Sequence, residues 1–206
     1  MITGFFTIGL LQTLAVISPG PDFAMVVRNT LAYSRRTGIF TTAGITTGVT
    51  FHLSYCLLGF AVLIHHTPFL FNIVKFAGSA YLIYIGFKEL FSKNGTSLTT
   101  EKTPGNMPSD LQAFHMGLFC NLLNPKVALY FIGLFTLVIS ADTPLAIQLS
   151  YGLEILLLTF LWFFSLTMML THPKIEPKLK SFQKIISRLM GVLLILFGTR
   201  LAMIHF

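Results

Sequence analysis

Two short stretches of this sequence place prolines beside polar side chains within apolar surroundings. Their proline, glycine and polar residues are Ser18, Pro19, Gly20, Pro21 and Asp22 in the first stretch, and Asn121, Asn124, Pro125 and Lys126 in the second. Proline lacks a backbone N–H and interrupts a helix, which leaves backbone groups open around it. In lipid such groups need partners from protein, water or a ligand. Paired breaks in the two halves of a chain point to a transporter's substrate site.

The groups at the two breaks suit both ends of a zwitterion. A helix that restarts after a break carries about half a positive charge and open N–H groups at its N-terminus, which suit a carboxylate. The Asp22 carboxylate, asparagine side chains and open carbonyl groups suit an ammonium group. We therefore expect an amino acid to bind near the middle of the membrane. A pair between Asp22 and Lys126 that only holds the two breaks together is the structural alternative.

Three ionisable residues within apolar segments are candidates for proton coupling: Asp22, Glu154 and His52. Ionisable groups at membrane depth are costly and point to function. For Glu154 the alternative is an edge position facing outer water, and for His52 it is a hydrogen-bonded packing role. His65, His66 and His172 lie in loops without carboxylate or cysteine partners at ligand spacing, so we predict no metal and no cofactor.

The composition is that of an integral membrane protein. Of 206 residues, 54% are hydrophobic and only 10% are charged, and the mean hydropathy is +0.77. A soluble domain carries about 25% charged residues. The length suits about six helical spans of about 20 residues each. We therefore predict an all-α protein with a single transmembrane domain, 1–206, whose partners include the lipid bilayer but no nucleic acid.

Apolar segments and breaks divide this domain into two similar halves. The six segments cover about 2–33, 38–64, 69–91, 111–140, 145–170 and 185–204. The first and fourth are too long for one straight span and contain the breaks at Pro19, Pro21 and Pro125. Repeat one covers about 1–92, a polar cytoplasmic linker about 93–110, and repeat two about 111–206.

The basic residues predict how the chain crosses the membrane. Lysines and arginines follow the first, third and fifth segments, and none follows the second or fourth. The positive-inside rule then places both termini outside the cytoplasm. Because each half has an odd number of spans, the halves insert in opposite directions. The sequence thus predicts two inverted three-helix repeats, whose first helices are broken at proline.

Together these motifs resemble the lysine exporter (LysE/RhtB) family of bacterial amino acid efflux permeases. The resemblance rests on Ser-Pro-Gly-Pro-Asp at 18–22, on the Arg35-Arg36 loop followed by the glycine pattern of 44–48, and on Asn-Leu-Leu-Asn-Pro-Lys at 121–126. It covers the whole chain. The aspartate after the second proline is similar to the threonine and homoserine exporter branch.

The resemblance implies export of small neutral or polar amino acids, threonine-like or homoserine-like, from the cytoplasm. It further implies proton antiport, homodimers and a place in the bacterial inner membrane. Substrate-binding roles carry over to Pro19, Gly20, Pro21 and Asp22, and to Asn124, Pro125 and Lys126. Many members have an acidic residue in the second span where this sequence has Val49 and Thr50, so Glu154 is the substitute candidate for ion coupling.

The sequence also leaves other functional hypotheses open besides export of threonine-like amino acids. The substrate class could instead be basic or branched-chain amino acids. Cys56 and Cys120 lie in different apolar segments without a CxxC motif, which predicts buried free thiols. An intramembrane thiol-redox carrier that uses both cysteines is nevertheless an alternative, and a passive channel is another. No hydrolase or nucleotide-binding motif is present, so we do not expect an enzyme.

Overall fold

The part of the chain that the structure describes consists of helices and short connections. The computed structural model describes residues 2–18, 20–66, 107–140 and 143–170, with single residues and pairs between 73 and 91 and between 188 and 203. Its continuous ranges form α1 (Ile2–Ile17), α2 (Pro21–Ala32), α3 (Arg35–His66), α5 (Asp110–Leu122), α6 (Pro125–Val138) and α7 (Leu145–Leu170). The all-α prediction is confirmed for these ranges. The predicted third and sixth segments and most of the linker lie outside them.

Two pairs of helices are bent at short breaks. The axes of α1 and α2 differ by 52°, and those of α5 and α6 by 57°. Pro21 and Pro125 stand at the first position of α2 and α6, where a missing N–H costs no hydrogen bond. By length and composition, the described residues hold three candidate membrane spans, namely α7 and each bent pair taken as one.

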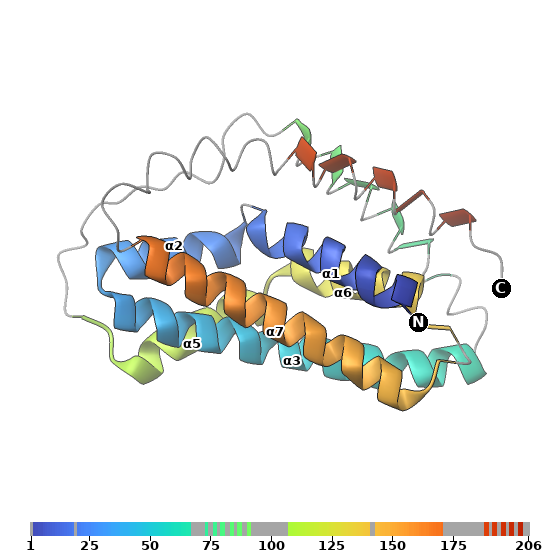
Figure 1. Ribbon diagram of the computed structural model, residues 1–206, viewed down its shortest axis with the longest axis horizontal. Helices are drawn as coiled ribbons and strands as arrows, with labels where there is room; N and C mark the ends of the chain where they lie inside the picture. The colour runs from blue at the N-terminus through green and yellow to red at the C-terminus, as the bar shows by residue number, and fades with distance from the viewer. Residues whose placement is uncertain are drawn as a thin grey trace.

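The helices lie side by side in a bundle, and the two bent pairs run in opposite directions. In Figure 1, α1 and α2 run from right to left, whereas α5 and α6 run from left to right. α3 has 32 residues and is therefore about 48 Å long, more than the hydrocarbon core of a bilayer. It packs along both α5 and α7. The breaks of both pairs thus come to lie within one bundle.

Glycines bring α3 and α5 into direct backbone contact. A Cβ atom added at Gly44 would collide with the Phe114 carbonyl oxygen, and one at Gly117 would collide with the Thr41 carbonyl oxygen. A Cβ at Gly48 would meet the Asn121 side chain. Small residues allow helices to approach this closely in membranes. The glycines of 44–48 thus allow α3 to pack closely on α5, and this packing sets the position of Asn121.

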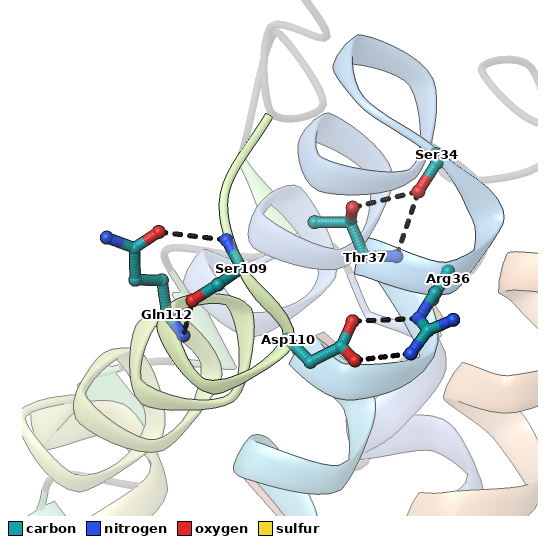
Figure 2. Close-up of polar contacts among 6 residues, drawn as sticks. All are labelled: Ser34, Arg36, Thr37, Ser109, Asp110 and Gln112. Carbon is teal, nitrogen blue, oxygen red and sulfur yellow. Dashed lines mark hydrogen bonds and ion pairs between the residues drawn. The ribbon is translucent and has the colours of Figure 1, made fainter. Parts of the chain in front are cut away.

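Polar contacts connect the first turns of α3 and α5 at one end of the bundle (Figure 2). Arg36 donates to Asp110 through Nε at 2.9 Å and through Nη2 at 2.6 Å. Ser109 caps α5 in a reciprocal capping box with Gln112, which satisfies two N–H groups of the first turn. Arg35 and Arg36, which the sequence places in a loop, are the first residues of α3 at this end. This is the predicted cytoplasmic end.

Described residues of the predicted third and sixth segments also contact each other closely. A Cβ atom at Gly86 would lie 2.7 Å from the Gly191 carbonyl oxygen and 2.6 Å from Ile195 Cγ1. At Gly198 it would lie 2.9 Å from the Ser79 carbonyl oxygen. The two segments therefore approach each other through small residues, as α3 and α5 do.

Two apolar clusters enclose the region of the breaks. One joins α1, α3, α6 and α7 through buried residues that include Ile8, Phe135 and Ile155. The other joins α1, α2, α3 and α7 and includes Phe23 and Phe163. In lipid, such packing stabilises the bundle through close van der Waals contact rather than through removal of surface from water. The clusters fix the two bends relative to each other.

Candidate functional site

A cavity of about 680 Å³, its mouth included, lies where the two bends meet. Seven of the nine residues of the predicted substrate site line this cavity: Ser18, Gly20, Pro21, Asp22, Asn121, Asn124 and Lys126. Pro19 lies outside the described residues, and Pro125 begins α6. The fold thus brings together two motifs that are about a hundred residues apart in the sequence.

Asp22 is held between the two bends. It stands in the first turn of α2, where the partial positive charge of the helix N-terminus favours a carboxylate. Asn121 Nδ2 donates to Asp22 Oδ2 at 2.7 Å, and Cys120 Sγ donates to Asp22 Oδ1 at 3.5 Å. The carboxylate of the first break is therefore oriented by the last residues of α5.

Lys126 also reaches from the second break to the first. Its Nζ donates to Ser18 Oγ at 3.3 Å. Ser18 directly follows the last residue of α1. The C-terminal end of a helix carries partial negative charge and favours a cation. A Cβ atom at Gly20 would lie 3.8 Å from Lys126 Nζ, so the ammonium group is also close to the start of α2. The cavity therefore holds one anionic and one cationic side chain.

The two helices that restart at the breaks are capped differently. Asn124 Oδ1 accepts a hydrogen bond from the Lys126 backbone N–H at 3.0 Å and so caps α6. Gly20 precedes α2 in an extended conformation and supplies no side-chain cap. The first N–H groups of α2 thus have no side-chain cap, which is the property of an anion site at a helix N-terminus.

His52 supports the site from α3 without lining the cavity. It is 2% exposed, and its Nε2 lies 3.2 Å from the Asn121 carbonyl oxygen. A carbonyl oxygen only accepts, so Nε2 carries the proton. In the neutral ring Nδ1 then accepts from the Tyr55 hydroxyl at 2.8 Å. Hydrogen bonds thus join Tyr55 to His52 and His52 to the backbone of Asn121, whose side chain orients Asp22.

Glu154 lies apart from Asp22 and His52, between α7 and α1. A Cβ atom at Gly9 would lie 2.9 Å from Glu154 Oε1, so the carboxyl group occupies the space that glycine leaves. Its Oε2 is buried and has no hydrogen-bond partner among the described residues. Glu154 is absent from the residues that line the cavity. The structure therefore does not bring Glu154 together with Asp22.

The cysteines occupy different surroundings. Both are free thiols. Cys56 is 2% exposed in the apolar cluster of α1, α3, α6 and α7, whereas Cys120 contacts Asp22. A thiol that exchanges electrons with a carrier needs access to it. The enclosure of Cys56 weighs against the thiol-redox alternative.

Three polar residues of the cavity were not predicted from the sequence: Gln12, Tyr130 and Thr159. Gln12 Nε2 donates to Thr159 Oγ1 at 2.9 Å, which connects α1 to α7. The available signal was the glutamine itself, because an amide in an apolar segment is costly unless it faces protein or a ligand. Tyr130 and Thr159 carry no comparable signal, since both residue types are common in helix packing.

Comparison with known proteins identifies the family of this site. A family profile described as "LysE type translocator" matches residues 13–204. The chain is similar to the membrane protein YrhP of Bacillus subtilis, described as uncharacterized, with 33% identity over 92% of this chain and 94% of the relative. No solved structure matches the chain.

Relatives with a stated activity are also similar over nearly the full length. The threonine efflux protein of Salmonella typhi is 29% identical, and that of Escherichia coli K12 is 26% identical; each match covers 98% of both proteins. The similarity therefore includes both breaks and all the helices between them.

Proposed function

This chain belongs to the family of LysE type translocators, and from that membership we propose that it exports threonine-like or homoserine-like amino acids from the cytoplasm. The relatives named as threonine efflux proteins support this substrate class. The observation that carries the proposal is that Asp22 and Lys126, from different breaks, line one cavity. An amino acid is a zwitterion, and two opposite charges in one cavity match it.

In the proposed complex each end of the substrate meets the opposite charge. The substrate carboxylate lies beside Lys126 Nζ and the N–H groups that begin α2. The substrate ammonium group lies beside the Asp22 carboxylate, which Asn121 already orients. Charge-assisted hydrogen bonds in a cavity with little water are stronger than those between neutral groups.

The proposed transport cycle alternates access by movement of two inverted three-helix repeats about this cavity. The opposite directions of the two bent pairs support the inversion. Helices that are interrupted at proline allow irregular backbone to line a cavity at the membrane midplane. Lysine and arginine in alternate loops support termini outside the cytoplasm in a bacterial inner membrane. A tag on either terminus should then be accessible to a protease added outside spheroplasts.

Proton antiport is the proposed energy source. Asp22 is the candidate proton acceptor in the cavity, where the Asn121 side chain orients it. His52, which is hydrogen-bonded to Tyr55 and to the Asn121 carbonyl oxygen, is a further candidate. Glu154 is the second candidate, at a separate position. Replacing Glu154 by Gln should abolish the response of transport to a pH gradient if this residue carries the proton, and leave it intact if Asp22 does. A homodimer is proposed from the resemblance alone, and crosslinking in membranes tests it.

Counterflow of labelled threonine in proteoliposomes tests the proposal, with a panel of unlabelled amino acids as competitors and with or without a pH gradient. Competition by threonine and homoserine together with gradient dependence supports a proton-coupled exporter. Stronger competition by basic or branched-chain amino acids would change the substrate class. Threonine flux without exchange or proton dependence would indicate a channel. Retained function after Ser replaces both cysteines excludes the thiol-redox alternative.

A further inference from the structure

The cavity is also lined by a group of three polar side chains that lie outside both breaks. Gln12 of α1, Tyr130 of α6 and Thr159 of α7 line it, with exposed fractions of 2%, 8% and 1%. Polar side chains this deeply buried in a membrane protein need partners inside the protein or in a ligand. Three helices contribute to the group, so chain connectivity alone does not explain its position.

The hydrogen bonds within this group leave two polar atoms unused. Thr159 Oγ1 accepts from Gln12 Nε2 at 2.9 Å and donates to the Ile155 carbonyl oxygen at 2.8 Å. Gln12 Oε1 and the Tyr130 hydroxyl are both buried without a hydrogen-bond partner among the described residues. Buried polar atoms are rarely left in this state, because the loss of hydration is then uncompensated. A bound ligand that supplies the missing partners removes this cost.

We propose that Gln12 and Tyr130, with Thr159 orienting the glutamine, bind the side-chain hydroxyl of the transported amino acid. This inference rests on the proposed function and adds the part of the site that selects the side chain. A hydroxyl group both donates and accepts. It donates to Gln12 Oε1 and accepts from the Tyr130 hydroxyl. A methyl group in its place, as in valine, leaves both protein groups unpaired, which is the strong form of discrimination.

The position of the group suits a short side chain. Gln12 precedes Ser18 by about 9 Å along α1, at about 1.5 Å of rise per residue. With the substrate's charged groups at the break, a side chain of one or two carbons brings a hydroxyl within reach of the glutamine. Phe131 and Phe163 line the same cavity, and their rings limit water there, which strengthens such hydrogen bonds.

The test compares threonine with valine, which replaces only the hydroxyl by a methyl group. The full chain in proteoliposomes exchanges labelled threonine, and the concentrations of unlabelled threonine and valine that halve the exchange give a selectivity ratio. Gln12→Met keeps the side-chain length, and Tyr130→Phe removes only the hydroxyl. Gln148→Met and Tyr151→Phe are matched controls, because neither residue lines the cavity.

The expected result is a fall of the threonine-to-valine selectivity by about tenfold in each cavity variant, the value of one hydrogen bond, with no change in the controls. Should Gln12→Met fail to insert, Tyr130→Phe provides the same test with a smaller change. Unchanged selectivity in a cavity variant that still exchanges threonine overturns the inference and leaves the proposed function standing. No exchange of any amino acid by folded wild-type protein overturns both.

Discussion

The two breaks have similar backbones but present different chemistry. Each separates a helix from a second one that begins with proline, and the bends of 52° and 57° are nearly equal. At the first break the restarting helix has a glycine before it and a carboxylate in its first turn. At the second, Asn124 caps the helix and Lys126 supplies a cation. The N–H groups that begin α2 at the first break are therefore open to a ligand. At the second break, the Asn124 side chain already accepts a hydrogen bond from the first turn of α6.

This difference indicates a division of roles between pseudo-equivalent positions. Asn121 and Lys126 both reach from the second break to the first, the one to Asp22 and the other to Ser18. The negative charge lies at a helix N-terminus and the positive charge beside a helix C-terminus, so each is stabilised by the helix it approaches. We infer that the substrate binds chiefly at the first break and that the second break serves to position the cation and amide that complete the site.

The largest effect is expected when the first break loses its charge. Asp22→Asn keeps the size of the side chain but removes the carboxylate that meets the substrate ammonium. A hydrogen bond to a charged group contributes about 2 kcal/mol, so threonine affinity should fall about thirtyfold. Threonine counterflow measures this fall. Asp110→Asn, at the exposed end of the bundle, is the matched control, and an Asp22→Asn protein with normal pH-dependent efflux contradicts the role of Asp22.

A smaller effect is expected at the cation of the second break. Lys126→Met should weaken threonine binding about tenfold, because one charge-assisted contact to the carboxylate is lost while the cap from Asn124 remains. Lys126→Arg keeps the charge and should recover part of the affinity. If the Met and Arg variants both bind threonine with wild-type affinity, the substrate carboxylate does not bind beside Lys126.

The cap of the second break should affect stability more than transport. Asn124→Ala removes the acceptor for the Lys126 N–H, and loss of an N-cap costs about 1 kcal/mol. Thermal unfolding in detergent should show this loss, while threonine affinity changes less than in Lys126→Met. The opposite order of effects would mean that the second break binds substrate directly.

The smallest effect is expected far from both breaks, at the Arg36–Asp110 ion pair (Figure 2). The side chains are 74% and 39% exposed, and exposed pairs contribute little. The hydrogen bonds from Arg36 hold the pKa of the Asp110 carboxyl below its ordinary value of 3.8. The stabilisation is therefore complete above that ordinary value and is lost as pH falls through the lowered pKa.

Unfolding midpoints of the wild type and of Asp110→Asn check the pair. The difference between them should be small and constant at neutral pH, and it should shrink in acid below the ordinary pKa of the carboxyl. A difference that grows on acidification contradicts the sign of this pKa shift.

The sequence predicted the local features of the site but not the contacts between its halves. The interruptions of the helices before Pro21 and Pro125 follow from the chemistry of proline. The close approach of α3 to α5 follows from Gly44 and its neighbours. The pairing of Asn121 with Asp22 depends on how each helix is rotated about its own axis. Helices that are apolar on all sides carry little sequence signal for that rotation.

The same reason explains why the sequence did not identify Gln12 and Tyr130 as cavity residues. It also explains why the sequence could not show whether Glu154 faces the cavity. Glu154 is a conspicuous carboxylate in the sequence, but the rotation of α7 turns it to Gly9 rather than to the cavity. Gln12 is less conspicuous, yet α1 turns it to Thr159 at the cavity wall. Residue type thus predicted which groups carry chemistry, and only the packed bundle shows which of them meet.

The central claim is that Asp22 meets the substrate ammonium group and Lys126 the substrate carboxylate. Binding of threonine, N-acetylthreonine and threonine methyl ester to the wild type, Asp22→Asn and Lys126→Met tests it most directly. The account predicts that Asp22→Asn weakens threonine but leaves N-acetylthreonine unchanged, and that Lys126→Met weakens threonine but leaves the ester unchanged. Equal losses for all three ligands in both variants would contradict it.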